Sequence, residues 1–283
     1  MRVARHRRYY LVLVRKLGRL AGWYKSDALR AAELNSAFVT SYSNGFGGMS
    51  GGNTRLLLAQ FEGLLDFLQQ GVPQLLPPEA RSAAAISTLR VQYAHLQTSL
   101  LPKFQAHLTS DPDYMAIAHS NLNIDNAYWW RDAEGVLDCG LIDWANFQIQ
   151  EVSGTIDMCL FCAGWGVMKA QQRALLQAFV DEYAAAGGPQ LSVDELALRF
   201  DMQLALSLPG QAGVPSQLYR RIKKEQWPSV TSITADPRVD GDTQDAFLVR
   251  SYLGNVLYRV ARWQQDGVYA RLCKWAGEPE QRG

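Results

Sequence analysis

The stretch YMAIAHSNLNIDNAYWWR, residues 114–131, places two short apolar runs on either side of a polar loop. The runs YMAIAH (114–119) and AYWWR (127–131) are too short for typical helices and are bounded by turn-forming residues, which predicts β-strands. The segment LDCGLID (137–143) has the same character, and DAEG (132–135) before it predicts a hairpin turn. The centre of the chain is therefore expected to form a small cluster of short strands.

Helical periodicity flanks this cluster on both sides. Apolar residues recur at three- and four-residue steps before it and again after it. The segments predicted as helices are 8–34, 54–70, 79–101, 154–164, 168–187, 193–208, 214–225 and 243–266. Pro102 is expected to kink or end the third of these, with a short turn to about His107. The order of helices, short strands and helices predicts a mainly α, α+β fold.

Composition limits the classes of protein that the chain can belong to. Its 283 residues are 48% hydrophobic, which is too apolar for a disordered chain, and the net charge of +1 gives no preference for nucleic acid. No apolar run approaches about 18 residues, so no membrane span is expected. Four cysteines are too few for a disulfide scaffold, which favours a reducing, cytoplasmic setting.

The amino terminus leaves one alternative for location. Residues 1–26 carry eight Lys or Arg and no Asp or Glu. A basic start without acids is typical of an organelle transit peptide. Serine is absent before Ser26 and large apolar residues are many, which favours instead a basic surface on a folded helix.

The polar loop carries residue types that suit phosphoryl transfer. Such a site needs one group that orients the nucleophile and two oxygen ligands that hold Mg²⁺ against the nucleotide phosphates. Asn126 follows Asn121 by five residues, and Asp143 ends the third predicted strand. Both Asn126 and Asp143 offer the oxygen ligands that Mg²⁺ prefers. The simpler alternative is a hairpin with an ordinary turn asparagine and a strand-end aspartate.

HSNLNIDN (119–126), followed by LIDWANF (141–147), resembles the aminoglycoside phosphotransferase and choline-kinase-like family, which has a protein-kinase-like fold. The pattern of that family is His-Gly-Asp, four residues, Asn, and then Ile-Asp-Trp or Ile-Asp-Phe. The resemblance implies His119 as the loop histidine and Asn126 and Asp143 as metal ligands. Asn121 stands where the family has its catalytic Asp.

Two further positions near the loop bear on the resemblance. Ser120 replaces the glycine that is usual in the family, and Trp144 follows Asp143 as in many members. Asp157 matches a later aspartate that the family uses to brace its catalytic segment. The resemblance also implies ATP and Mg²⁺ as cofactors and a small molecule with a hydroxyl group as the acceptor. Neither nucleic acid nor a membrane is expected as a partner, given the net charge and the absence of a long apolar run.

The resemblance covers about residues 8–283 and corresponds to the carboxy-terminal lobe of the family. We expect one kinase-like domain over residues 1–283. Its expected parts are a helical segment (1–113), the strands of the catalytic loop and metal ligands (114–143), and a helical subdomain (144–283). Only 118 residues precede His119 and their pattern is helical, so the strand-rich nucleotide-binding lobe is expected to be absent, or to lie in a missing segment of a longer chain.

Asn121 leaves open whether the expected protein is an enzyme or an inactive relative. A carboxylate accepts the proton of a substrate hydroxyl, whereas a neutral amide only accepts a hydrogen bond, and a positioned base is typically worth about 10²–10⁴ in rate. One hypothesis is therefore an impaired phosphotransferase, for which Asp125 is a conceivable substitute base. The alternatives are an inactive pseudoenzyme or binding scaffold, and a helical interaction protein with an accidental motif.

Other features have simpler interpretations than a functional site. GFGGMSGG (45–52) lacks the lysine of a Walker loop and is interpreted as a flexible loop, and CLFC (159–162) lacks a second Cys/His pair, so core thiols are expected. The remaining residues in this group are interpreted as structural or surface positions: His6, His95, His107, the pair Trp129 and Trp130, and the basic segment YRRIKKEQW (219–227).

Overall fold

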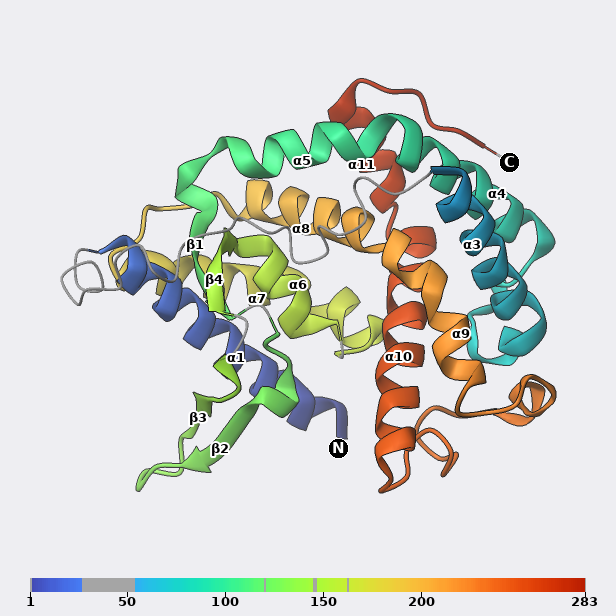
Figure 1. Cartoon of the computed structure of the whole chain (residues 1–283). Helices are drawn as coiled ribbons and strands as arrows, with labels where there is room; N and C mark the ends of the chain where they lie inside the picture. The colour runs from blue at the N-terminus through green and yellow to red at the C-terminus, as the bar shows by residue number, and fades with distance from the viewer. Residues whose placement is uncertain (1, 27–53, 120, 145–146, 162, 283) are drawn as a thin grey trace. The chain divides into compact units, whose positions relative to one another are not determined.

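A computed structural model describes residues 2–26, 54–119, 121–144, 147–161 and 163–282 (Figure 1). The chain groups into two compact units, each assembled from two separated stretches of sequence. The first unit comprises Met1–Gly47 with Gln105–Gln203, and the second comprises Gly48–Phe104 with Leu204–Gly283. The single domain expected over residues 1–283 stays a prediction. The two units are described separately below.

The mainly helical fold with a few short antiparallel strands is confirmed by the described residues. The α-helices are α1 (Arg2–Lys25), α3 (Thr54–Asp66), α4 (Ala83–His95), α5 (Leu101–Ser110), α6 (Val152–Leu160), α7 (Trp165–Ala185), α8 (Val193–Ser207), α9 (Val214–Tyr219), α10 (Gln244–Gln265) and α11 (Val268–Ala276). The strands are β1 (Met115–His119), β2 (Ala127–Arg131), β3 (Leu137–Leu141) and β4 (Phe147–Glu151). No helix of these residues is long and apolar enough to cross a membrane.

In the first unit, α1 lies alongside α7 at close range (Figure 1). Two glycines one turn apart on α1 make this approach possible. A Cβ atom on Gly18 would come within 2.7 Å of the carbonyl oxygen of Phe179, and one on Gly22 within 2.5 Å of that of Tyr183. Both distances are too short for non-bonded atoms, so the helix pair depends on glycine at these two positions. Helix α1 thereby forms a fixed support for the strands that it contacts.

The strands of the first unit form two separate antiparallel pairs. Strand β1 pairs with β4 so that His119 lies opposite Phe147, and β2 pairs with β3 so that Ala127 lies opposite Leu141. The predicted DAEG turn is confirmed, because the amide of Gly135 donates to the carbonyl oxygen of Asp132 at 3.0 Å. Strand β4 was not predicted.

In the second unit, α3 and α4 contact each other through aromatic side chains. The rings of Phe61 and Tyr93 stack with their centroids 3.5 Å apart. Trp263 of α10 is buried, and its indole N–H donates to the side-chain oxygen of Gln92 at 2.8 Å. Apolar packing with paired polar groups thus holds α10 against α4, as expected for a buried helix in a helical unit.

Pro102 does not end the helix in which it lies. A π-turn over Leu96–Leu100 precedes it, and the amide of Leu101 donates to the carbonyl oxygen of Leu96. This shift of the hydrogen bonds places Pro102 in the first turn of α5, where a missing N–H is tolerated. Helix α5 then continues to Ser110, so the expected short turn to His107 is wrong.

Two predicted helix boundaries need correction, and one helix was missed. Helix α1 ends at Lys25 rather than at residue 34, and residues 27–53 lie outside the described residues. Helix α9 ends at Tyr219 rather than at residue 225, because the chain turns to bury Trp227, whose indole N–H donates to the carbonyl oxygen of Ile222 at 3.1 Å. Helix α11 was not predicted, and it begins after Gly267, which has a φ of 64°.

Candidate functional site

His119 ends β1 and is completely buried. Its Nε2–H donates to the carbonyl oxygen of Ile142 at 2.7 Å, and the backbone N–H of Asn121 donates to its Nδ1 at 3.4 Å. A ring that donates at Nε2 and accepts at Nδ1 is a neutral imidazole in one defined tautomer. Because Ile142 follows β3, this one side chain joins the β1–β4 pair to the end of the β2–β3 pair.

The loop after His119 is closed by hydrogen bonds to its own backbone. The side-chain Nδ2–H of Asn126 donates to the carbonyl oxygen of Asn121 at 2.6 Å. The oxygen of Asn123 accepts the amide of Asp125 at 2.9 Å, and the amide of Asn126 donates to the carbonyl oxygen of Asn123 at 3.0 Å. The five-residue spacing between Asn121 and Asn126 therefore corresponds to a direct hydrogen bond across the loop. Since Nδ2 faces the loop, the Oδ1 atom of Asn126 points away from that bond.

Asp143 lies close to Asn126 along the backbone, at the base of the β2–β3 hairpin. The amide of Ile142 donates to the carbonyl oxygen of Asn126 at 3.0 Å, which extends the ladder by one residue beyond Ala127 and Leu141. Asp143 is the next residue and is exposed. The hairpin therefore brings together the two residues that the sequence predicted as metal ligands, at the level of the backbone.

The backbone of Asp143 is strained. Its φ of 61° is the one positive value among the non-glycine residues that the structure describes. Left-handed geometry costs a side-chain-bearing residue about 1–2 kcal/mol, and such strain is common where a side chain has a function. The turn is supported by Trp144, whose indole N–H donates to the carbonyl oxygen of Leu141 at 3.0 Å and whose ring lies 4.9 Å from that of His119.

Asn121 is fixed through its backbone rather than through its side chain. Its N–H donates to His119 and its carbonyl oxygen accepts from Asn126. The residue at the position of the expected base is thus held at two points, and its half-buried side chain is a neutral amide. The predicted site residues His119, Asn121 and Asn126 are joined directly, while Ser120 lies outside the described residues.

The donor set was tested for its fit to Mg²⁺. The amide oxygen of Asn126 and the carboxylate of Asp143 are hard oxygen ligands, as Mg²⁺ requires. Within the described part of the chain, no group of three or more His, Cys, Asp or Glu side chains could hold a metal ion. Two protein ligands fit Mg²⁺ in the manner of nucleotide sites, where phosphate and water oxygens complete the shell. These residues do not form a closed structural metal site.

The other residues singled out in the sequence lie outside the candidate loop or have structural roles, apart from Asp125. Asp157 is buried on α6, and Asp125 is exposed on the loop. Cys159 is a buried core thiol as expected, whereas Cys162 and the segment 45–52 lie outside the described residues. His95 and His107 make hydrogen bonds within their units, to Tyr269 and Glu195, which agrees with structural roles. The side chain of His6 is outside the described set.

The aromatic pair on β2 and the basic segment also have structural explanations. Trp129 packs edge-on against Tyr9 of α1 at 4.6 Å, while Trp130 is 38% exposed and stacks on Tyr128 at 5.1 Å. The alternation of a strand places the two tryptophans on opposite faces. Lys223 and Lys224 are exposed as expected, but they lie at the start of a short 3-10 helix (Lys224–Ser229) rather than on the face of α9.

Sequence analysis did not identify the partner of His119. That partner is a backbone carbonyl, at Ile142, so no residue type signals it. Comparison with known proteins adds no further assignment: the chain matched no protein-family model, no curated protein and no solved structure.

Proposed function

We propose that residues 119–144 form the metal–phosphate loop of a small-molecule phosphotransferase-like protein with the carboxy-terminal lobe of a kinase-like fold. The observation that carries this proposal is the link from the Asn126 side chain to the backbone of Asn121 at 2.6 Å. It fixes the side chain of Asn126, whose backbone pairs with Ile142, the residue before Asp143, at the base of the same hairpin. Phosphoryl transfer requires oxygen ligands for the metal that are held in place, and a fixed residue that orients the substrate hydroxyl.

In this proposal Asn126 and Asp143 hold Mg²⁺ through their oxygen atoms. A Mg²⁺ ion held there would neutralise part of the charge on the phosphates of ATP. The left-handed φ of Asp143, 61°, lies at the turn that follows β3, directly after the residue whose amide donates to the backbone of Asn126. His119 is a positioning residue, because its two hydrogen bonds join the loop to the turn at Asp143.

Asn121 sets the limit of the proposed activity. Its amide oxygen accepts a hydrogen bond from a substrate hydroxyl and orients it, but it cannot take up the proton. In a loose, largely dissociative transition state, orientation and charge neutralisation provide most of the catalysis, so slow transfer is compatible with an amide. We therefore propose a protein that binds Mg²⁺ with ATP, or with a similar phosphate compound, and transfers slowly.

A second candidate function is a non-catalytic binding scaffold. The observation that favours it is the neutral amide at position 121, which is held in the place of a base by both backbone groups. A scaffold would keep Mg²⁺-dependent phosphate binding while showing no transfer. The two candidates therefore agree on binding and differ on turnover.

Binding is tested by thermal stabilisation with ATP in the presence and absence of Mg²⁺. We expect Mg²⁺-dependent stabilisation in the wild type and its loss in Asn126→Ala and Asp143→Asn. Glu134→Gln is the matched control, since it removes an exposed carboxylate at the far end of the same hairpin. Equal stabilisation in all four proteins would overturn the assignment of Asn126 and Asp143.

A further inference from the structure

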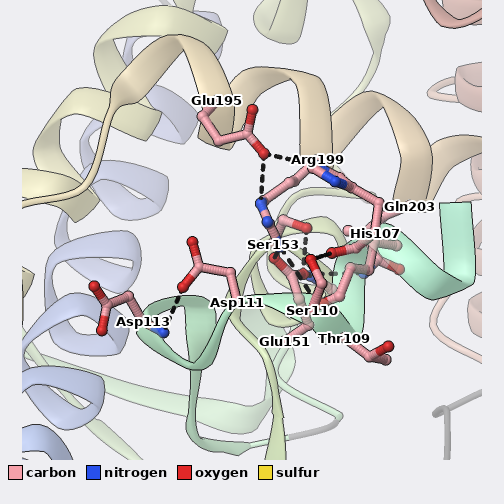
Figure 2. Close-up of polar contacts among 12 residues, drawn as sticks. His107, Thr109, Ser110, Asp111, Asp113, Glu151, Ser153, Glu195, Arg199 and Gln203 are labelled. Atoms are coloured by element: carbon pink, nitrogen blue, oxygen red, sulfur yellow. Dashed lines mark hydrogen bonds and ion pairs between the residues drawn. The ribbon is translucent and has the colours of Figure 1, made fainter. Parts of the chain in front are cut away.

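Glu151 is a buried carboxylate in the first unit, away from the candidate loop. It is the last residue of β4 and caps the amino terminus of α6, with a side chain that is 4% exposed. Its Oε2 accepts three hydrogen bonds, from the hydroxyl of Ser153, from the amide of Gly154 at 3.1 Å and from the side-chain Nε2 of Gln203 at 3.0 Å (Figure 2). One oxygen therefore connects the first turn of α6 to α8.

The other oxygen of Glu151 is poorly compensated. Its Oε1 is buried and accepts no hydrogen bond from the described residues. The Nη1 atom of Arg199 lies 3.8 Å from it, but Arg199 is engaged elsewhere. Its Nε donates to the Oε1 of Glu195 at 2.8 Å, and its Nη1 donates to the carbonyl oxygen of Leu108 at 3.4 Å. A buried charge with an unsatisfied oxygen is costly.

The charged and titratable groups around Glu151 come from three segments. Arg199 and Glu195 lie on α8, His107 lies on α5, and Tyr114 precedes β1. Figure 2 shows that His107 and Arg199 both bind Glu195, with the Nε2 of His107 at 2.7 Å from its Oε1. The guanidinium of Arg199 also lies 4.0 Å above the ring of Tyr114. Two carboxylates thus share one guanidinium, and Glu195 has the shorter contact.

This arrangement determines how Glu151 responds to pH. Burial raises the pKa of the Glu151 carboxyl above its ordinary value of 4.5, and the donors from Ser153, Gln203, Arg199 and Gly154 only partly oppose this. If the first turn of α6 separates from α8, the carboxyl meets water and its pKa returns toward the ordinary value. By linkage, the closed arrangement is favoured at lower pH and the opened arrangement at higher pH.

We propose that Glu151 is a pH-dependent clasp between the first turn of α6 and α8, which opens more readily as the pH rises. The clasp lies at the end of the β1–β4 ladder opposite His119, since Glu151 pairs with Met115 and Phe147 pairs with His119. The same helix α6 carries the buried Asp157. The clasp is a property of this unit and does not depend on the proposed function.

The test is native-state amide hydrogen exchange on the whole chain between pH 5 and pH 8. The reporter is the amide of Gly154, which donates directly to Glu151. After correction for the intrinsic pH dependence of exchange, we expect its protection to fall with rising pH, by up to about tenfold per pH unit between the two pKa values. Amides in the middle of α7, such as that of Val180, serve as the internal reference and should show constant protection.

Two variants complete the test. Glu151→Gln removes the titration and should make the protection of Gly154 independent of pH. Glu182→Gln, on α7 of the same unit, should leave the wild-type profile unchanged. A flat profile for Gly154 in the wild type overturns the proposal, even if Glu151→Gln does not fold. An unchanged slope in a folded Glu151→Gln protein would overturn it as well.

Discussion

The candidate loop and the Glu151 clasp lie at opposite ends of the β1–β4 ladder and hold their polar side chains in different ways. In the loop, His119 and Asn126 bond to backbone groups of Ile142 and Asn121, and both groups are neutral. In the clasp, the carboxylate of Glu151 bonds partly to side chains and leaves one oxygen without a donor. The loop is thus pre-organised, while the clasp contains a buried charge that responds to pH.

The largest effect is expected from a change that introduces charge into the loop. Asn121→Asp restores a proton acceptor at a position fixed by two backbone hydrogen bonds. We expect phosphorylation of a hydroxyl compound to rise by about 10²–10⁴ over the wild type, measured as ADP formation over a panel of acceptors. Asn123→Asp, two residues away, is the matched control and should give no gain. Retained Mg²⁺–ATP binding without turnover in Asn121→Asp would favour the scaffold.

The next effect concerns the residue that joins the two strand pairs. His119→Ala removes a fully buried ring and two hydrogen bonds, so we expect the free energy of unfolding to fall by about 3 kcal/mol. His107→Ala removes a partly exposed histidine and is expected to cost about 1 kcal/mol. Urea denaturation measures both values. Equal losses in the two variants would contradict the linking role of His119.

The clasp predicts a pH dependence of global stability that the loop does not share. Because the folded-state pKa of Glu151 is raised, its unfavourable contribution is absent below about pH 4.5 and grows as the pH rises through the folded-state pKa. The stability of Glu151→Gln relative to the wild type should therefore increase with pH, by at most about 1.4 kcal/mol per unit. Denaturation at several pH values checks this, with Glu182→Gln as control. Parallel curves for wild type and Glu151→Gln would refute it.

The smallest effect tests the strain at Asp143. Glycine adopts a φ of 61° without steric cost, so Asp143→Gly should stabilise the fold by about 0.5 kcal/mol while abolishing Mg²⁺-dependent stabilisation by ATP. Asp125→Gly, in the same loop at negative φ, should lower the stability by about 0.5 kcal/mol. If both variants lose stability equally, the strain at Asp143 has no energetic significance.

The sequence predicted the parts of the fold that follow from local patterns. Strands β1 to β3 were found because each is a short apolar run beside turn-forming residues, and the DAEG turn was found because of its composition. Strand β4, FQIQE, was missed although its apolar and polar residues alternate as in a half-buried strand, because it has only two apolar residues and leads directly into α6. Helix α11 was missed because Gly267 separates it from α10 by a left-handed turn that resembles a simple helix end.

The loop could be predicted from the sequence, whereas the clasp could not. His119, Asn121 and Asn126 lie within eight residues, so their spacing is visible in the sequence. The clasp joins residues far apart in the chain, with Gln203 52 residues from Glu151 and Glu195 88 residues from His107. Charged residues at such separations carry no local signal, and only the packing of α5 and α8 brings them together. The left-handed backbone of Asp143 was equally unpredictable, because aspartate does not require it.

The central claim is that Asn126 and Asp143 hold Mg²⁺ against the phosphates of a nucleotide. Isothermal titration calorimetry of the whole chain with ATP, with and without Mg²⁺, tests it most directly. The account predicts binding that requires Mg²⁺ and that Asp143→Asn removes. An absence of heat in both titrations, or binding that is the same with and without Mg²⁺, would contradict it.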